Sequence, residues 1–296
     1  MSIYKYTSFE NLKHILNGSI RLTQPSAFND PFELLPEIYL KENIENKQIG
    51  LDIASKPRES NIARLPDDFE NEQCNDIPAR YLIKSISESV GILCLSKNPN
   101  SLLMWSHYAD QYKGVVVEFD EEHEFFSDMH CINYEDNRPK INFYKLLEED
   151  NILLSEMCFK PKVWEYEEEV RIIRCLKNCK NVGKDQDGKY DIYTMNIPLE
   201  AIKSITMGER IPIENTRFIF GKLYDTNIEI KWALISNLGY GFRYEIIKHD
   251  KPFSEMSPVI SPRSAHIFKD LPGDLGEMSR WMIEHHPMSE IVNLTV

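Results

Sequence analysis

Three consecutive glutamates interrupt an aromatic and branched stretch, KVWEYEEEVRII, which covers residues 162–173. Its flanking residues predict a strand over residues 164–173. Because side chains alternate along a strand, Glu167, Glu169 and Arg171 would then share one face. Like charges about 7 Å apart on one face repel, so they are tolerated only in water or beside a cation. Two hypotheses follow: a pair of catalytic carboxylates that Arg171 keeps ionised, or a solvated face of a sheet.

A second polar group lies in YKYTS, near the start of the chain. Lys5, Tyr6 and Thr7 lead from a predicted strand into a predicted helix, and Thr7 and Glu10 have the spacing of a capping box. A helix N-terminus favours anions, so a phosphate could bind there. An edge strand followed by an ordinary cap would have the same residues.

Two further stretches place polar side chains among structured apolar ones. SAFNDPFE carries Asn29 in a turn that its proline makes rigid, which suits a ligand loop but is also ordinary turn chemistry. In MWSHYADQYKGVVVEFD, Trp105 and Tyr108 are three residues apart on a predicted helix, so they share a face. His107 lies to one side of them. These side chains predict either a ligand-binding face or part of the core.

Composition excludes several classes of protein. The chain has 296 residues and a net charge of −13, with 47 acidic and 34 basic residues, so it lacks a long basic stripe for nucleic-acid backbone. There is no signal pattern and no apolar run of the roughly 20 residues that a membrane span needs. We therefore expect a cytoplasmic protein that does not contact a membrane. The six cysteines are scattered and predict free thiols and no metal site.

The elements that must position these residues are predicted from apolar periodicity. The pattern indicates an α+β domain over residues 1–250 and a C-terminal appendage over residues 251–296. We expect strands at 2–7, 90–96, 114–120, 164–173, 190–197, 201–208 and 242–250, helices at 102–112, between 211 and 238 and around 276–286, and surface helices with a loop at 41–79.

Four motifs together resemble a bacterial family known as domain of unknown function 2971. They are YKYTS, FNDPFE, WSHYADQYKGVVVEFD and WEYEEEVRI, and they stand in the order typical of that family. The resemblance covers about residues 1–250. The family name carries no function, so it implies none for this chain.

A weaker resemblance bears on chemistry. A strand, a short helix ending in Ile-Leu-Asn-Gly and a second strand are similar to the opening of ADP-ribosyltransferase folds, including toxin-type enzymes. This likeness implies mixed or antiparallel sheets with flanking helices around a cleft that binds NAD as substrate. It implies that Lys5 or Tyr6 on the first strand and Ser96 on a middle strand hold the NAD. It also implies that Glu167 and Glu169 form the Glu-x-Glu element that does the chemistry. The first strand of such enzymes carries an arginine or a histidine, and the YKY strand of this chain has neither.

The expected function is therefore a glutamate-based, NAD-dependent ADP-ribosyltransferase, acting as a toxin or phage-defence effector. Its acceptor would be a protein or a nucleic acid, and its partner a protein of a defence or toxin–antitoxin system. One alternative is a Mg²⁺-dependent nuclease of a defence system that uses Asp30, Glu33, Glu118 and the glutamate stretch, with Lys113 or Lys160 nearby. The other is a non-catalytic binding or sensor module.

Overall fold

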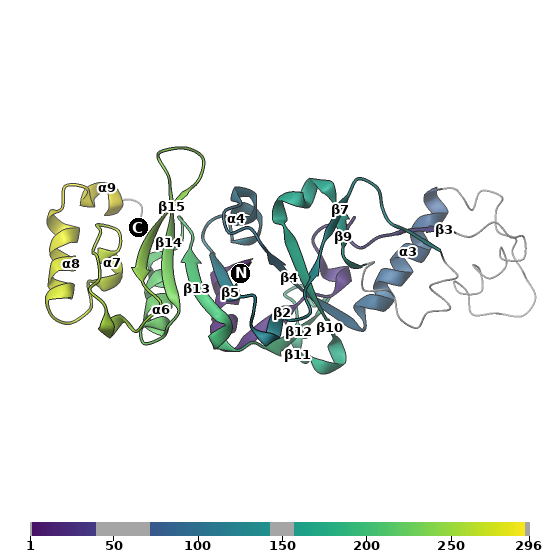
Figure 1. Ribbon diagram of the computed structural model, residues 1–296, viewed down its shortest axis with the longest axis horizontal. Helices are drawn as coiled ribbons and strands as arrows, with labels where there is room; N and C mark the ends of the chain where they lie inside the picture. Colours follow the sequence, from purple (N-terminus) through teal and green to yellow (C-terminus); the bar gives the residue numbers. More distant parts are fainter. Residues whose placement is uncertain (1, 40–71, 143–156, 294–296) are drawn as a thin grey trace, which may run out of the picture.

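The computed structural model describes residues 2–39, 72–142 and 157–293 of the chain. An eight-stranded sheet in the order β15-β14-β13-β5-β1-β4-β10-β6 runs along the long axis (Figure 1). Its neighbouring strands are antiparallel except β13 and β14, which are parallel. The strands are β1 (Ser2–Thr7), β4 (Val90–Ser96), β5 (Val115–Asp120), β6 (His130–Cys131), β10 (Glu169–Cys175), β13 (Ile202–Met207), β14 (Glu229–Ile235) and β15 (Phe242–Lys248).

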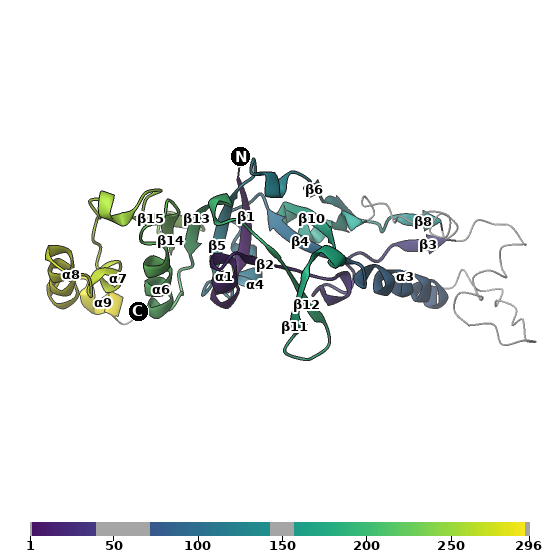
Figure 2. The ribbon, with the colours of Figure 1, turned by 90° about the horizontal axis from the view of Figure 1, so that it is seen from below.

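Smaller sheets flank the main one. A three-stranded sheet has the order β11-β12-β2, and β11 and β12 project away from the plane of the main sheet (Figure 2). Two parallel pairs join β3 to β8 and β7 to β9. Their bounds are β2 (Ser19–Leu22), β3 (Glu37–Tyr39), β7 (Asn133–Glu135), β8 (Lys140–Asn142), β9 (Phe159–Pro161), β11 (Lys180–Lys184) and β12 (Asp191–Asn196).

The helices are α1 (Phe9–Leu16), α3 (Glu72–Ser87), α4 (Leu102–Tyr108), α6 (Ile213–Leu223), α7 (Ala265–Phe268), α8 (Asp274–His285) and α9 (Ser289–Asn293). Short 3-10 helices include η1 (Pro25–Ala27) and η5 (Lys162–Glu167). A mixed sheet with several helices confirms the α+β class. The surface segment predicted at 41–79 lies outside the described residues up to residue 71. No helix in the described part of the chain is both long and apolar enough to cross a membrane.

Strand alternation divides the core between the two faces of the main sheet. Ile3 and Val117 lie in the larger cluster, together with Leu12 of α1 and Phe220 of α6. Tyr6 belongs to a smaller cluster on the opposite face. The helix α1 begins after Ser8, whose hydroxyl accepts a hydrogen bond from the Asn11 amide at 3.3 Å. The predicted capping box at Thr7 and Glu10 is therefore wrong by one residue, because Thr7 is still paired with Val115 in β1.

Outside the candidate site, two predicted helical regions differ from the structure. The region between residues 211 and 238 holds one helix, α6, and then the strand β14, where helices were predicted. The helix predicted at 102–112 ends at Tyr108, because Asp110, Gln111 and Tyr112 take left-handed conformations with φ of 47°, 53° and 71°. Contacts hold this turn in place: the Tyr112 ring stacks on Trp105, and its hydroxyl donates to the Leu102 carbonyl at 2.9 Å. The residue that follows the turn must be glycine, since a Cβ at Gly114 would lie 2.2 Å from the Thr7 carbonyl.

The C-terminal helices extend the main core. Phe268 of α7 and Phe253 pack against Phe220 of α6, with ring centroids 5.3 and 4.8 Å away. Arg217 of α6 also donates from Nε to the His266 carbonyl at 2.8 Å. These contacts explain how residues beyond 250 attach, while the predicted boundary at residue 250 stays a prediction.

Replacing Gln111 by glycine should stabilise the protein. A left-handed non-glycine residue costs roughly 1–2 kcal/mol, and glycine removes most of this while losing some chain entropy on folding. We expect Gln111→Gly to raise the free energy of unfolding by about 0.5–1 kcal/mol, measured by urea denaturation. The control is Lys113→Gly, at an exposed neighbour that does not have a positive φ. This change should lower the free energy of unfolding. Equal effects at both positions would contradict the argument.

Phe268→Ala should lower the free energy of unfolding by about 3–5 kcal/mol, because it empties a fully buried site against α6. Met278→Ala, on the exposed side of α8, should change it by less than about 0.5 kcal/mol. Thermal or urea unfolding of both variants measures this. Similar small effects would mean that α7 is not part of the core.

Candidate active site

A cavity of about 390 Å³ opens on the face of the main sheet that carries α4. Its lining comes from β1, β4 and β10, the turn after β2, α4, and the β9–η5 segment. The lining residues are Tyr4, Lys5, Tyr6, Thr23, Ala27, Phe28, Asn29, Glu33, Cys94, Leu95, Ser96, Met104, His107, Tyr108, Lys160, Glu167 and Glu169.

Three adjacent strands bring a row of side chains into this cavity. Tyr4 of β1 is opposite Ser96 of β4, and Ser96 is opposite Glu169 of β10. Residues directly opposite each other in a sheet point to the same face. All three line the cavity. The row therefore places a first-strand tyrosine, a middle-strand serine and a third-strand glutamate side by side.

The cavity lies where two sheets diverge along β4. At one end β4 pairs with β1 through Ser96, and at the other it pairs with Thr23, the residue after β2, through Ile92. Between these points the Cys94 carbonyl accepts a hydrogen bond from Lys5 Nζ at 3.2 Å. A side chain thus satisfies a carbonyl that no neighbouring strand reaches.

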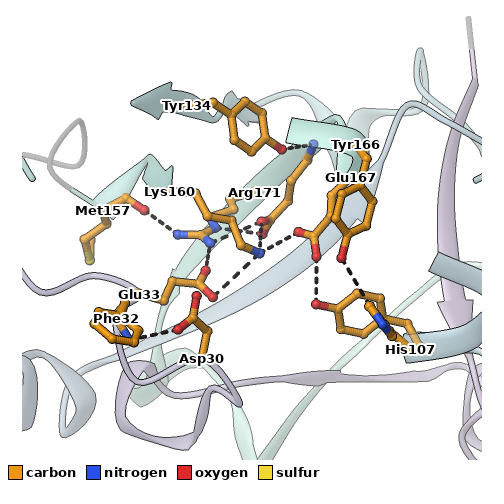
Figure 3. Close-up of polar contacts among 12 residues, drawn as sticks. Asp30, Phe32, Glu33, His107, Tyr134, Met157, Lys160, Tyr166, Glu167 and Arg171 are labelled. Carbon is orange, nitrogen blue, oxygen red and sulfur yellow. Dashed lines mark hydrogen bonds and ion pairs between the residues drawn. The ribbon is translucent and has the colours of Figure 1, made fainter. Parts of the chain in front are cut away.

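At the floor of the cavity, the Lys160 ammonium lies among three carboxylates (Figure 3). Its Nζ is 2.5 Å from Glu167 Oε2, 3.0 Å from Glu169 Oε2 and 3.6 Å from Glu33 Oε2. Lys160 is only 6% exposed, and all three glutamates are buried. Buried charges are stable only when paired and hydrogen-bonded, and this cluster meets that condition.

Arg171 supports the carboxylates from beneath. Its side chain is fully buried, and Nε donates to Glu169 Oε1 at 2.8 Å. The guanidinium also pairs with Glu33 and donates to the Met157 carbonyl at 2.7 Å. Glu33 thus ties the turn after β2 to β10 through Arg171. Arg171 does not line the cavity, and its contact with Glu169 is the one expected of a residue that keeps this carboxylate ionised.

Burial and charge shift the pKa values in opposite directions. Burial raises the pKa of Glu169, and the cation Lys160 opposes this. For Lys160, burial lowers the pKa, but Glu169 and Glu167 together outweigh it and hold the pKa above its ordinary value. Burial lowers the pKa of Arg171 to about 9. Lys160 therefore stays protonated at neutral pH and serves as the fixed cation of the cluster.

The predicted strand over residues 164–173 is wrong in its first half. Residues Lys162–Glu167 form the 3-10 helix η5, and β10 begins at Glu169. Between them Glu168 is left-handed, with φ 44°, and turns outward to accept a hydrogen bond from Asn98 at 2.9 Å. Glu167 and Glu169 do face the same cavity, but a reversal at Glu168 brings them together, not strand alternation.

The remaining predicted ligand residues divide into two groups. The structure brings six of them to the cavity: Lys5, Tyr6, Asn29, Ser96, His107 and Tyr108. Trp105 and Thr7 are not among the lining residues. Trp105 is fully buried between Tyr6 and Tyr112, and Thr7 is held in β1 by its pairing with Val115. Their predicted roles in ligand binding stay predictions, and the contacts described for both side chains are structural.

Tyrosines complete the surroundings of the glutamates. Tyr108 donates to Glu167 Oε1 at 2.7 Å, and burial followed by the charge of Glu167 raises its pKa. The Tyr134 hydroxyl accepts from the Glu169 amide at 2.7 Å. Ser96 donates to the Glu167 carbonyl at 2.5 Å. Glu167 is thus held by partners from β4, α4 and β9.

Sequence reasoning missed Lys160 as the centre of the site. It also missed the role of Glu33 in pairing with Arg171, although FNDPFE had been singled out. A lysine between Phe159 and Pro161 in a short apolar run was the available signal for Lys160. Nothing local to Glu33 could have indicated a partner 138 residues away.

Glu118 lies at another place. It accepts hydrogen bonds from Ser204 at 2.6 Å and Lys231 at 3.3 Å, and it lines a separate cavity of about 770 Å³. The carboxylate set Asp30, Glu33 and Glu118 expected for a nuclease is therefore not brought together. Within the described residues, no cluster of three or more histidine, cysteine or acidic side chains is placed to hold a metal ion.

In a comparison with known protein families, part of the chain matches a family model. Residues 104–172 match the model of a family described as a protein of unknown function, DUF2971. This match confirms the resemblance over α4, β5 and the glutamate stretch. It includes Tyr108, Lys160, Glu167, Glu169 and Arg171, but not Glu33 or Ser96. No curated protein and no solved structure matches the chain.

Lys160→Met should destabilise the protein by about 3–5 kcal/mol, because it leaves buried carboxylates without their cation. Protonation relieves their repulsion, so the loss should shrink as the pH is lowered from 8 towards 5. Urea unfolding across this pH range measures both effects. Lys162→Met, at an exposed neighbour, is the control and should change stability by less than about 0.5 kcal/mol at every pH. A pH-independent loss in Lys160→Met would contradict the paired cluster.

Proposed function

We propose that the protein cleaves NAD and transfers its ADP-ribose to an acceptor, with Glu169 and Glu167 in the two acidic roles. The observation that carries this proposal is the row Tyr4–Ser96–Glu169 across three adjacent strands, opening into one cavity with Glu167. The transferase likeness requires a first-strand residue, a middle-strand serine and a Glu-x-Glu element around one site. Tyr4 takes the first position in register, ahead of Lys5 and Tyr6.

The divergence of two sheets along β4 is further support. ADP-ribosyltransferase-like folds bind NAD in a cleft between two sheets, and here Thr23, the residue after β2, both pairs with β4 and lines the cavity. One of the two sheets has eight strands, which is larger than the likeness implies. An ADP-ribosyltransferase-like fold is thus part of the proposal.

The charge of the cluster fits the reaction. Three carboxylates (Glu33, Glu167 and Glu169) pair with two cations (Lys160 and Arg171), so these five side chains carry three minus two, or one, negative charge when all are ionised. Lys5, which also lines the cavity, lies outside these ion pairs and donates to the Cys94 carbonyl. As the bond between nicotinamide and ribose breaks, its electrons leave with nicotinamide and positive charge develops on the ribose. A preorganised negative charge in a water-poor site stabilises that state.

The two glutamates are suited to different steps. Glu169 is fixed by Lys160 and Arg171, which suits a group that stabilises the ribose cation without moving. Glu167 contacts Lys160 and Tyr108 and lies on the α4 side of the cavity, where an acceptor would approach. It would take the proton that the acceptor loses when its nucleophile bonds to the ribose.

Glu169→Gln and Glu167→Gln should each lower the rate of nicotinamide release or transfer by about 10²–10³-fold, as for the loss of one preorganised electrostatic contact. Glu169→Gln should lower both nicotinamide release and transfer. Glu167→Gln should lower transfer to the acceptor more than nicotinamide release, because Glu167 acts on the acceptor and not on the bond to nicotinamide. The assay measures nicotinamide released from NAD by the purified protein at matched folded concentration.

The control is Glu165→Gln, an exposed glutamate of the same 3-10 helix, which should keep full activity. If all three variants release nicotinamide at the same rate, the glutamates have no catalytic role. If the wild-type protein releases none but cleaves nucleic acid in a manner that a chelator abolishes, the nuclease alternative replaces this proposal.

A further inference from the structure

Four rings gather beside the cavity, and we call His107, Tyr108, Trp164 and Tyr166 the aromatic rim. His107 and Tyr108 line the cavity, and the other two rings pack against His107. The His107 ring lies 6.1 Å from Tyr108, 6.2 Å from Trp164 and 6.3 Å from Tyr166 between centroids. Its Nδ1 is 3.1 Å from the Tyr166 hydroxyl (Figure 3). The rim therefore joins two segments, α4 and η5, that are far apart in the sequence.

The position of the rim calls for an explanation beyond packing. Trp105, two residues before His107 on α4, is fully buried. By contrast, His107 is exposed, and Trp164 and Tyr166 are half-buried. The chain thus keeps large rings within reach of solvent directly beside Glu167. Exposed aromatic clusters beside a polar cavity are typical of sites that stack a flat ligand.

Charge limits what kind of ring can bind. The Lys160 ammonium lies 5.3 Å from the centroid of the Trp164 ring, so the attraction of that ring for a cation is already used. The Trp164 face over which this ammonium lies is therefore not open to a second cation. A neutral, electron-rich ring can stack on the rim without competing for that contact.

We propose that the aromatic rim is a binding subsite for a neutral purine ring. The inference rests on the proposed function, which makes NAD the substrate and puts two sources of such a ring at this site. One is the adenine of NAD itself, and the other is a purine of the acceptor. In either case the ring lies next to Glu167, since Tyr108 of the rim donates to that carboxylate.

Adenosine is the probe, because it carries the ring without phosphates and so removes any attraction to cations. Trp164 reports binding: Trp105 and Trp232 are buried, and Trp281, which is 55% exposed, is replaced by phenylalanine to silence it. Adenosine should quench the fluorescence of Trp281→Phe protein, and calorimetry should give the same affinity. In this background Trp164→Ala should weaken adenosine binding by about tenfold when measured by calorimetry.

Two variants control for folding. Trp164→Phe keeps a ring and should bind adenosine within about threefold of the parent protein. Val163→Ala changes an exposed side chain of the same 3-10 helix and should bind as the parent does. If the parent protein does not bind adenosine, or if Trp164→Phe binds as weakly as Trp164→Ala while both stay folded, the subsite does not exist.

Competition identifies the source of the ring. If NAD displaces adenosine, the rim holds the adenine of NAD; if adenosine still binds when NAD is saturating, it holds a purine of the acceptor. Both results support the subsite. Nicotinamide release is measured separately, so the two proposals fail independently. If adenosine binding depends on Trp164 but no nicotinamide is released from NAD, the transferase proposal alone is overturned. If nicotinamide is released but adenosine affinity does not depend on Trp164, the proposed purine subsite alone is overturned.

Discussion

The structure around the cavity depends on one buried ammonium group. Lys160 sits within ion-pair distance of Glu33, Glu167 and Glu169, which come from the turn after β2, from η5 and from β10. Removing such charges from water is expensive, and only their mutual pairing offsets the cost. The three segments must therefore meet at Lys160 for any of these carboxylates to be buried. This requirement fixes the walls of the cavity and, through Arg171, the floor beneath it.

Local pattern was sufficient where the structure is local. The apolar runs at β4, β5 and β13 predict strands correctly because alternation within a few residues decides which face is buried. The pairing of Glu167 with Glu169 was also foreseen, yet for the wrong reason. The aromatic residues of η5 suggested a strand, but Trp164 and Tyr166 pack against His107, and the chain bends at a left-handed Glu168. Contacts with α4 outweigh the preference of these residues for strands.

The remaining features depend on partners distant in sequence, so the pattern could not reveal them. A lysine flanked by Phe159 and Pro161 is read as a surface charge until three glutamates are found around it in space. Likewise, WSHYADQYKG favours a continuous helix, but the chain takes a left-handed turn after Tyr108, where Tyr112 stacks on Trp105 and donates to the Leu102 carbonyl. In both cases tertiary contacts decide the outcome: the burial of a lysine in one, and the end of a helix in the other.

The divergence of the sheets explains why polar chemistry is concentrated at this point. β1 leaves β4 after a single paired position, so the edge of β4 that faces away from β10 has no strand partner until Thr23 pairs with Ile92. A gap in a ladder leaves carbonyls that must find donors, and Lys5 supplies one to Cys94. The same gap gives side chains on the open face, Ser96 and Glu169 among them, a space that no strand or helix fills. The buried ion-pair cluster at the floor and the aromatic rim beside the cavity then favour a ligand with two matching ends. Its reacting centre would become positive near Glu169, and its uncharged flat ring would lie against the aromatic rim.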